Sequence, residues 1–364
     1  MRLLVVNPGS SSLKLRVLDD RDQVAAEQDL PALAGKAELD SLEAFLSKAG
    51  AVEACGVRVV HGGKDFVASV RVDASVVERL EAVSALAPLH NPPALAALRE
   101  LMRLRPDLPV VACFDTAFHA RMPASAATYA IPRRWREEFG VRRYGFHGLS
   151  HAHVSRRAAE LVGAKRIVSC HLGAGASLAA VDRGVSVDTT MGFTPMEGLV
   201  MATRSGSVDP GLVLWLQTSK GMRAADVERA LDRESGLLGL SESSADMRAV
   251  VEAAHGGDAR AELAIAVYVH RLRAQIAAMV AALGGLDALV FTGGIGENAA
   301  AIREATCSSL EFLGIRLDAE RNRSLDLRDG HASVAAAGSE VAVLVIRARE
   351  DLEIAREVRA RMDS

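Results

Sequence analysis

The stretch VVNPGSSSLK, residues 5–14, decides the fold. An apolar run over residues 3–6 ends in a short polar turn, and an alternating run over residues 13–18 follows it. This pattern predicts a strand, a glycine turn and a second strand. Backbone N–H groups at a glycine turn can approach an anion, and the Ser, Asn and Lys side chains add further donors. The stretch favours a phosphate-binding turn, although an ordinary hairpin explains the same residues when they are considered alone.

A second stretch of the same kind lies in the other half of the chain. In IVSCHLGAGASLAAV, residues 167–181, an apolar strand again enters a glycine-rich bend and a strand-like run leaves it. Two such turns, about 160 residues apart, indicate an internal duplication. A dinucleotide fingerprint is the alternative, but its third glycine is replaced by Leu178 and the residues after the bend have a strand pattern.

A third glycine cluster, FTGGIGEN at residues 291–298, follows an apolar strand over residues 288–291. It precedes a helical pattern that begins near Ala299. A helix N-terminus after a strand and glycines is a favourable place for a nucleotide, because N–H groups and the helix dipole face the ligand. No G-x-x-x-x-G-K-[ST] motif occurs in the sequence, which excludes a P-loop. Three glycine bends in two halves predict a nucleotide held between two domains.

The remaining periodicity predicts alternating strands and helices, which is typical of an α/β protein. Further strands are expected at residues 57–60, 110–114 and 341–346. Helices are expected at residues 40–49, 74–85, 93–103, 151–161, 209–218, 224–232 and 259–283.

Composition narrows the class of protein. The chain has 364 residues with 49% hydrophobic content, which is enough for two domains with their own cores. Its net charge of −3, with both signs scattered, gives no reason to expect nucleic acid or a membrane surface as a partner. No stretch of about 20 apolar residues or signal-peptide pattern is evident, and the four cysteines show no C-x-x-C spacing. These features indicate a cytoplasmic enzyme.

Several motifs resemble those of the acetate kinases, a family within the actin-like, sugar-kinase and Hsp70 superfamily. They occur in the family's order and cover nearly the whole chain. The motifs are NPGSSSLK at 7–14, RVVHGG at 58–63, APLHNP at 87–92, FDTAFH at 114–119, YGFHGLSH at 144–151, TPMEGLVMATRSG at 194–206 and FTGGIGEN at 291–298.

The resemblance implies an α/β chain with a duplicated actin-like (ribonuclease H-like) two-domain fold and a nucleotide cleft between the domains. Residues 1–117 would form the N-terminal domain, together with a returning C-terminal helix at 352–364. Residues 118–351 would form the C-terminal, nucleotide-binding domain. A homodimer is also implied.

The resemblance also implies a reaction, the reversible, ATP- and Mg²⁺-dependent phosphorylation of acetate to acetyl phosphate by direct in-line transfer. Mn²⁺ is an alternative ion. Arginine suits both the carboxylate and the transferring phosphoryl group, because its planar fork matches their oxygens. The residues that match the family's catalytic positions are Arg58, Asp115, His147 and Arg204.

The other matching positions fall into four groups. The substrate-binding group is Arg58, Val60, Leu89, Phe146 and Pro195. The nucleotide-binding group is Lys14, His171, Gly173, Gly175, Asp246, Arg248, Gly293, Gly294, Gly296 and Asn298. The metal-associated group is Asn7 and Glu350, and the supporting group is Ser10, Ser12, His90 and His119.

The chain departs from the family pattern at several positions. Ala174 stands where the family has Asn, Ser207 where it has Asp, and Arg347-Ala348-Arg349 where a Pro-Thr-Asn-like sequence is usual. The loss of the Asn amide removes a donor to the nucleotide phosphates. The added cations beside the magnesium carboxylate should either weaken Mg²⁺ binding or strengthen phosphate contact.

Other functions remain open from the sequence. One is a propionate or butyrate kinase, and another is an actin-like nucleotide-binding module with little catalysis. A zinc site at His147, His151 and His153 is disfavoured, because the last two residues would point apart on a helix.

Overall fold

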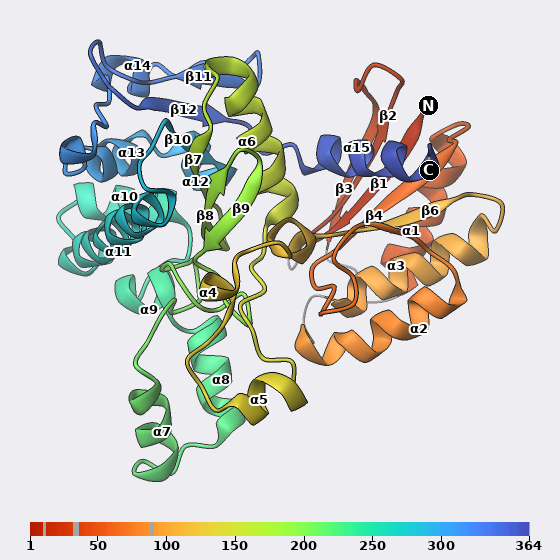
Figure 1. The fold of residues 1–364 in the computed structure, drawn as a ribbon, viewed down its shortest axis with the longest axis horizontal. Coiled ribbons are helices and arrows are strands. Elements are labelled where there is room, and N and C mark those ends of the chain that lie inside the picture. Colours follow the sequence, from red (N-terminus) through yellow and green to blue (C-terminus); the bar gives the residue numbers. More distant parts are fainter. Residues whose placement is uncertain (10–11, 32–35, 88–90, 364) are drawn as a thin grey trace. The chain divides into compact units, whose positions relative to one another are not determined.

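The computed structural model describes residues 1–9, 12–31, 36–87 and 91–363. These residues form two compact units (Figure 1). Unit 1 comprises Met1–Ala120, Phe146–His153 and Arg349–Ser364, and unit 2 comprises Arg121–Gly145 and Val154–Ala348. The domain boundaries inferred from the resemblance stay a prediction.

Unit 1 is built on a mixed sheet whose strand order is β3-β2-β1-β4-β6-β5 in the described part of the chain. Strands β1, β4 and β6 are parallel neighbours, whereas β2, β3 and β5 pair antiparallel to the strands beside them. The elements are β1 (Leu3–Pro8), β2 (Ser12–Leu18), β3 (Val24–Pro31), α1 (Lys36–Lys48), β4 (Ala54–Val59), β5 (Val70–Arg71), α2 (Ala74–Val83), η1 (Ser84–Leu86), α3 (Asn91–Leu104), β6 (Val110–Phe114), η2 (Asp115–His119) and α15 (Glu350–Met362).

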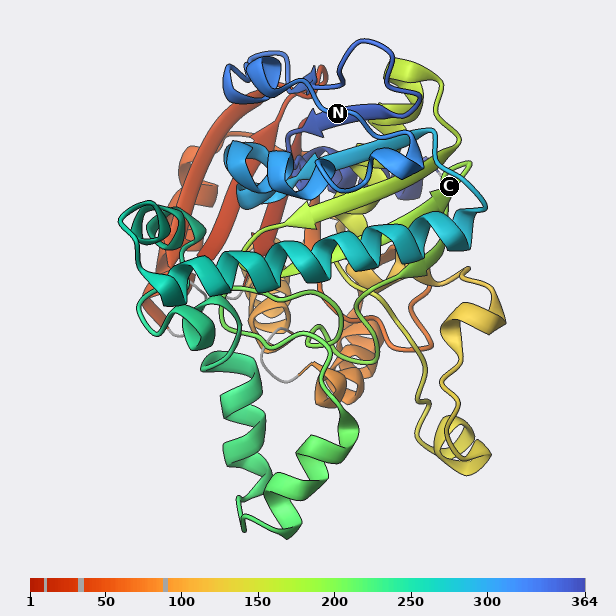
Figure 2. The same ribbon diagram turned by 90° about the vertical axis from the view of Figure 1, so that its left-hand side faces the viewer.

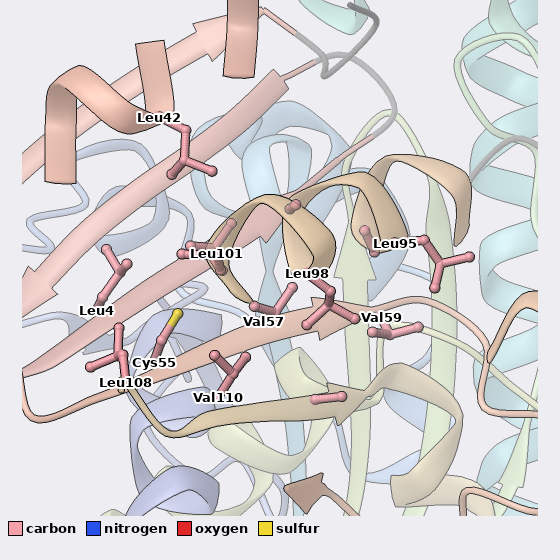
Figure 3. Close-up of a cluster of buried hydrophobic side chains, with 14 of the residues drawn as sticks. Leu4, Leu42, Cys55, Val57, Val59, Leu95, Leu98, Leu101, Leu108 and Val110 are labelled. Atoms are coloured by element: carbon pink, nitrogen blue, oxygen red, sulfur yellow. The ribbon is translucent and has the colours of Figure 1, made fainter. Parts of the chain in front are cut away.

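Helices cover both faces of this sheet, which explains the continuous apolar run of β6. All five residues of β6 are buried, as expected for a central parallel strand. On one face, α1, α2 and α3 pack on the sheet, and Figure 3 shows Leu95, Leu98 and Leu101 of α3 over the strands. Their i, i+3 spacing places these three side chains on one side of the helix.

The C-terminal helix α15 covers the opposite face. Its Ile354, Ala355 and Val358 are buried against residues of β1, β4 and β6 (Figure 1). Gly56 of β4 permits this close approach, because a Cβ atom there would lie 2.3 Å from Cγ2 of Ile354. A larger residue at this position would push α15 off the sheet.

Unit 2 has a sheet with the strand order β9-β8-β7-β10-β12-β11 in the described residues. Strands β7, β10 and β12 are parallel, and β8, β9 and β11 pair antiparallel with their neighbours. The elements are α4 (Ala124–Ala127), α5 (Arg133–Glu138), β7 (Arg166–Leu172), β8 (Ala176–Asp182), β9 (Val185–Thr189), α7 (Pro210–Thr218), α8 (Ala224–Arg233), α9 (Gly236–Ser241), α10 (Met247–His255), α11 (Ala259–Leu283), β10 (Ala288–Thr292), α12 (Gly293–Asn298), α13 (Ala300–Cys307), η3 (Glu311–Leu313), α14 (Ala319–Arg323), β11 (His331–Ser333) and β12 (Ala342–Ile346). Helix α6 (Gly148–Val162) begins in unit 1 and ends in unit 2.

The two sheets repeat one topology. When the strands of each unit are numbered in the order in which they occur along the chain, the order across both sheets is third, second, first, fourth, sixth and fifth. The parallel and antiparallel neighbours are also the same in both sheets. The internal duplication predicted from the two glycine turns, and with it the duplicated α/β fold, is confirmed.

Helix α11 is long and apolar enough to cross a membrane by length and composition alone, which the sequence analysis did not anticipate. It lies along the sheet of unit 2 and contacts β7, β8 and β9 (Figure 2). Tyr268, Leu272 and Ile276 form part of its buried face, and charged residues such as Arg271 interrupt the apolar sequence. These contacts are those of a core helix.

The structure corrects several predicted elements. Strand β4 spans Ala54–Val59, so Val60 lies beyond its end. The glycines of residues 293–298 are themselves helical in α12, and a second helix, α13, follows, instead of one helix that begins near Ala299. Strand β3 was missed because it is an exposed edge strand whose polar residues break the alternation. The four cysteines are buried and unpaired.

Candidate functional site

Four polar side chains meet at the carboxyl end of the parallel strands of unit 1. Asn7 lies near the end of β1, Arg58 near the end of β4, and Asp115 directly after β6. Because these strands are parallel neighbours, their ends lie at the same edge of the sheet. Glu350 is the first residue of α15 and joins them there.

Arg58 is the centre of this ionic cluster. Its Nη2 and Nε atoms donate to Oδ2 of Asp115 at 2.7 and 3.0 Å, and Nη1 donates to Oδ1 of Asn7 at 3.2 Å. The amide of Asn7 donates in turn to Oε2 of Glu350 at 2.7 Å, and that oxygen lies 3.8 Å from Nη1 of Arg58. The guanidinium is therefore fixed in orientation by an amide and two carboxylates.

Burial and charge act in opposite directions in this cluster. Burial alone would lower the pKa of Arg58, but the Asp115 and Glu350 carboxylates raise it above its ordinary value. Burial raises the pKa of Asp115, and Arg58 limits that rise. The two groups form an ion pair, because a guanidinium stays charged in proteins and two of its N–H groups meet one carboxylate oxygen.

One oxygen of the cluster has no partner among the described residues. Both bonds from Arg58 go to Oδ2 of Asp115, and Oδ1 is buried without a hydrogen bond. With the Glu350 carboxylate and the Asn7 amide nearby, the cluster offers oxygen ligands, which Mg²⁺ prefers. No group of three or more His, Cys, Asp or Glu forms a metal cage in the described chain. The residues fit an ion that keeps water and substrate oxygens among its ligands.

The start of helix α6 approaches Asp115 closely. A Cβ atom on Gly148 would lie 1.9 Å from the carbonyl oxygen of Asp115, so only glycine allows this contact. His147, just before it, has a φ of 55°, in the left-handed region that a histidine seldom adopts. Backbone strain of this kind is concentrated at functional positions, which supports the choice of His147 as a candidate.

Phe146 is held from two sides in unit 1. Its ring lies edge-on to His61 at 5.4 Å, and its carbonyl is 3.1 Å from Nε2 of His119. Burial lowers the pKa of His119 to about 4, so the ring is neutral at physiological pH and donates from Nε2. Asn91 fixes His61 by pairing with both its backbone N–H and its carbonyl, a contact that the sequence analysis missed.

The remaining candidate residues of unit 1 differ in how deeply they are buried. Val60 is buried, whereas Lys14 of β2 is exposed. The backbone N–H of Gly9 donates to the carbonyl of Ser12 at 2.7 Å, which closes the first glycine turn. The candidates that lie outside the described residues are Ser10, Leu89 and His90.

In unit 2, the second and third glycine bends lie against each other. Gly173 donates to the carbonyl of Gly175 at 3.0 Å and closes the turn between β7 and β8. Gly293 has a φ of 78°, and a Cβ atom there would lie 2.8 Å from the carbonyl oxygen of Leu172 at the end of β7. The structure thus brings together two stretches that are 120 positions apart in the sequence.

Glu297 and Arg303 form hydrogen bonds to the backbone of the third bend. Neither was predicted as a site residue. Oε1 of Glu297 accepts from the backbone N–H groups of Gly293 and Ala348, at 3.0 and 2.9 Å. Arg303 donates to the carbonyls of Gly296 and Glu297, both at 2.9 Å. Glu297 therefore occupies the first amide of α12, which the sequence analysis had assigned to a nucleotide.

Arg204 is the candidate phosphoryl-binding residue of unit 2, and it is largely buried. Its Nε donates to Oδ1 of Asp232 at 3.1 Å and its Nη1 donates to the carbonyl of Pro195 at 3.1 Å. The structure therefore brings two of the predicted residues, Arg204 and Pro195, into contact. Asp232 lies 28 positions away and was not predicted.

The loop that carries Pro195 is anchored by three further residues. The Tyr129 hydroxyl bonds to the Glu197 carboxylate and accepts from the N–H of Phe193 at 2.9 Å. Arg143 donates to the same carboxylate at 2.7 Å. These contacts fix the backbone of the loop next to Pro195.

Other candidates of unit 2 have ordinary structural contacts. Asp246 caps α10, and Arg248, which is exposed, pairs with it at 2.6 Å. Hydrogen bonds from Arg248 hold the pKa of Asp246 below its usual value. His171 is half-buried in β7, and Gly294 and Asn298 are exposed on α12.

The structure also shows the surroundings of the residues that depart from the family pattern. Ser207 exchanges hydrogen bonds with Gly198, so it joins two parts of the loop. Arg349 pairs with Asp351 at 2.8 Å, and Arg347 is exposed. The carbonyl of Ala174 accepts from Ala202 at 3.0 Å, whereas its side chain is exposed.

Comparisons with known proteins identify similar chains. The model of the acetokinase family matches residues 34–356. An acetate kinase from Synechococcus sp. is 50% identical over 315 residues, which cover 85% of this chain and 77% of that protein. The crystal structure of Porphyromonas gingivalis acetate kinase matches with a TM-score of 0.90 and 36% identity over 99% of both chains. A propionate kinase from Francisella tularensis matches with a TM-score of 0.90 and 37% identity over 98% of both chains.

Proposed function

The chain belongs to the acetokinase family, and we propose that it transfers the γ-phosphoryl group of ATP to acetate in a reversible, Mg²⁺-dependent reaction. The products are acetyl phosphate and ADP. The resemblance inferred from the sequence motifs is confirmed by the family match, and the enzyme is a kinase with a carboxylate as acceptor.

The ionic cluster around Arg58 is the observation that carries this proposal. A guanidinium has five N–H groups, and three of them have partners among the described residues. The two others match the number that a bidentate contact with a ligand carboxylate uses. Acetate is ionised at neutral pH and is already nucleophilic, so no strong general base is needed.

The residues of unit 2 supply what the phosphoryl donor needs. The adjoining bends at Gly173–Gly175 and at α12 offer glycine backbone where phosphate oxygens can approach closely. Arg204 would bind the transferring phosphoryl group, since such a group is stabilised mainly by positioning and by positive charge. Asp232 and the carbonyl of Pro195 would hold its guanidinium in place.

Asn7, Asp115 and Glu350 would hold Mg²⁺, directly or through water. When bound, the ion neutralises charge on the phosphates of the nucleotide. His147 would donate to the phosphoryl oxygens, and Phe146 and Val60 would contact the methyl group of acetate.

The reaction is tested by a coupled assay with acetate, propionate and butyrate, each with ATP, GTP and pyrophosphate in turn. We expect acetate with ATP to give the highest kcat/KM and chelation of Mg²⁺ to abolish turnover. Arg58→Ala should be inactive, whereas Arg105→Ala, on the half-buried Arg105 that lies outside the cluster, should behave like wild type. An active Arg58→Ala enzyme would contradict the assignment of the cluster.

A propionate kinase is the second candidate, because one of the matched solved structures has that name. The two acids differ by one methylene, which is worth about 1–3 kcal/mol in a pocket. A higher kcat/KM for propionate in the same panel would decide for this candidate. Binding of ATP without turnover of any of the acids would instead indicate a nucleotide-binding module.

We further propose that the enzyme acts in the cytoplasm as a homodimer. Light scattering on the purified protein would give the mass of the assembly, against 38.5 kDa for one chain. A mass of one chain at micromolar concentration would contradict the dimer.

A further inference from the structure

Arg303 is a buried arginine without an acidic partner. It lies in α13, and its side chain is 1% exposed. It makes four hydrogen bonds, and every acceptor is a neutral oxygen: the carbonyls of Gly296, Glu297 and Asn322, and Oδ1 of Asn322. Within the described residues, no carboxylate lies within ion-pair distance of it.

This arrangement is unusual, because a buried charge normally has a partner of opposite sign. Burial lowers the pKa of Arg303 to about 10, so the guanidinium remains protonated at neutral pH. The titratable group beside it, the Cys307 thiol, has a pKa raised by burial to about 12 and is neutral. The positive charge is therefore not compensated by the protein around it.

The charge lies under one of the candidate nucleotide-binding bends. Two of the hydrogen bonds of Arg303 go to the backbone of α12, while Gly294 and Asn298 of the same helix are exposed. The Glu297 carboxylate is engaged by the N–H groups of Gly293 and Ala348. One side of this bend thus rests on a buried cation and the other side is accessible to a ligand.

We propose that Arg303 is an electrostatic positioning residue for the nucleotide, holding the bend and favouring the anionic phosphates over the uncharged nucleoside. This inference rests on the proposed function, since it requires ATP to bind at α12. Charges interact over several ångströms with little screening when one of them is buried, so an effect on phosphate affinity does not require direct contact.

Asn322→Asp tests this proposal with a side chain of nearly the same size, although it loses the hydrogen bond that Nδ2 of Asn322 donates to the carbonyl of Ala300 at 2.9 Å. Oδ1 of Asn322 accepts from Nε of Arg303 at 2.7 Å, so an aspartate would place a carboxylate directly on the guanidinium. We expect the Kd of ATP, measured by calorimetry, to rise about tenfold. The Kd of adenosine should change less than twofold. Arg303→Gln, which removes the charge, should act in the same direction.

Two further variants separate charge from structure. Arg303→Lys keeps the charge with fewer hydrogen bonds and should retain most of the preference for ATP over adenosine. Arg323→Gln removes an exposed cation of α14, which is 3.6 Å from Glu304, and should leave both affinities unchanged. Melting temperatures of all four variants report whether they fold.

Two results would overturn the inference. One is an Asn322→Asp protein that binds ATP as tightly as wild type. The other is an equal loss of ATP and adenosine affinity in that variant, which would make Arg303 a structural residue only. Failure of the proposed function is recognised separately, because wild-type protein would then neither bind ATP nor phosphorylate acetate.

Discussion

The Nη2 atom of Arg58 lies 2.7 Å from Oδ2 of Asp115, and Asp115 is fully buried. Arg58 lies in β4, and Asp115 directly follows β6, the parallel neighbour of β4. Removal of one partner from such a pair leaves an uncompensated charge in the protein. Stability and catalysis should therefore both depend on this contact.

Asp115→Asn removes the negative charge and keeps the size of the side chain. Because Arg58 would lose its charged partner, we expect the free energy of unfolding to fall by about 3 kcal/mol. We also expect kcat to fall at least about 100-fold, as for the loss of a residue that orients charge in a site. Asp107→Asn, on a largely exposed residue, is the matched control. Full activity of Asp115→Asn would exclude Asp115 from the site.

Arg204→Ala should lower kcat much more than it raises the KM for acetate. A contact with the transferring phosphoryl group strengthens as charge develops in the transition state, and loss of such an arginine costs about 10³-fold. Asp232→Asn keeps an acceptor for Nε and should lower kcat less. Arg223→Ala, on an exposed arginine that pairs with Asp226, is the control for steady-state kinetics. A folded Arg204→Ala enzyme with wild-type kcat would contradict its assigned role.

Ala174→Asn should lower the KM for ATP and leave the preference among acids unchanged. The side chain of Ala174 is exposed at the tip of the β7–β8 turn, so an amide can be added without a clash. A hydrogen bond to a charged group is worth about 1.5–3 kcal/mol, which corresponds to at least a tenfold change. If the variant changes the KM for acetate and not that for ATP, this turn does not bind the nucleotide.

Val60→Ala should shift preference from acetate towards propionate. The smaller side chain opens space for about one methylene, and the ratio of kcat/KM values should change roughly tenfold. Val60 lies one residue beyond β4 and belongs to neither described core cluster of unit 1. A variant that is less stable but keeps the wild-type ratio would identify Val60 as a plain core residue.

The raised pKa of Glu357 predicts that the stability of the protein depends on pH. Burial and the nearby Glu353 raise the pKa of its carboxyl to about 7, from 4.5 in the unfolded chain. Between these values the folded state binds the additional proton, so stability should fall as pH rises through this window and level off above it. The expected loss is about 3 kcal/mol. Denaturant unfolding of Glu357→Gln should lack this slope, and an unchanged slope would assign it to another group.

Local sequence determined the central elements of the fold. Strand β6 was predicted with its observed bounds, and so was α11, because each is long or continuously apolar and makes its periodicity plain. The two glycine turns indicated the duplication, because the glycines and donor side chains that a phosphate-binding turn requires are adjacent in the sequence. Edge strands such as β3 left no such signal, because their exposed side chains are not selected for burial.

Only the tertiary structure decided how the polar residues meet. Asn7 and Glu350 are 343 positions apart, yet they share a hydrogen bond of 2.7 Å. Arg303 has no sequence pattern that marks it, because its role depends on carbonyls and on Asn322 around it rather than on its neighbours in the chain. Local periodicity reports which side of an element is buried, whereas the pairing of charges depends on which ends of strands the fold brings together.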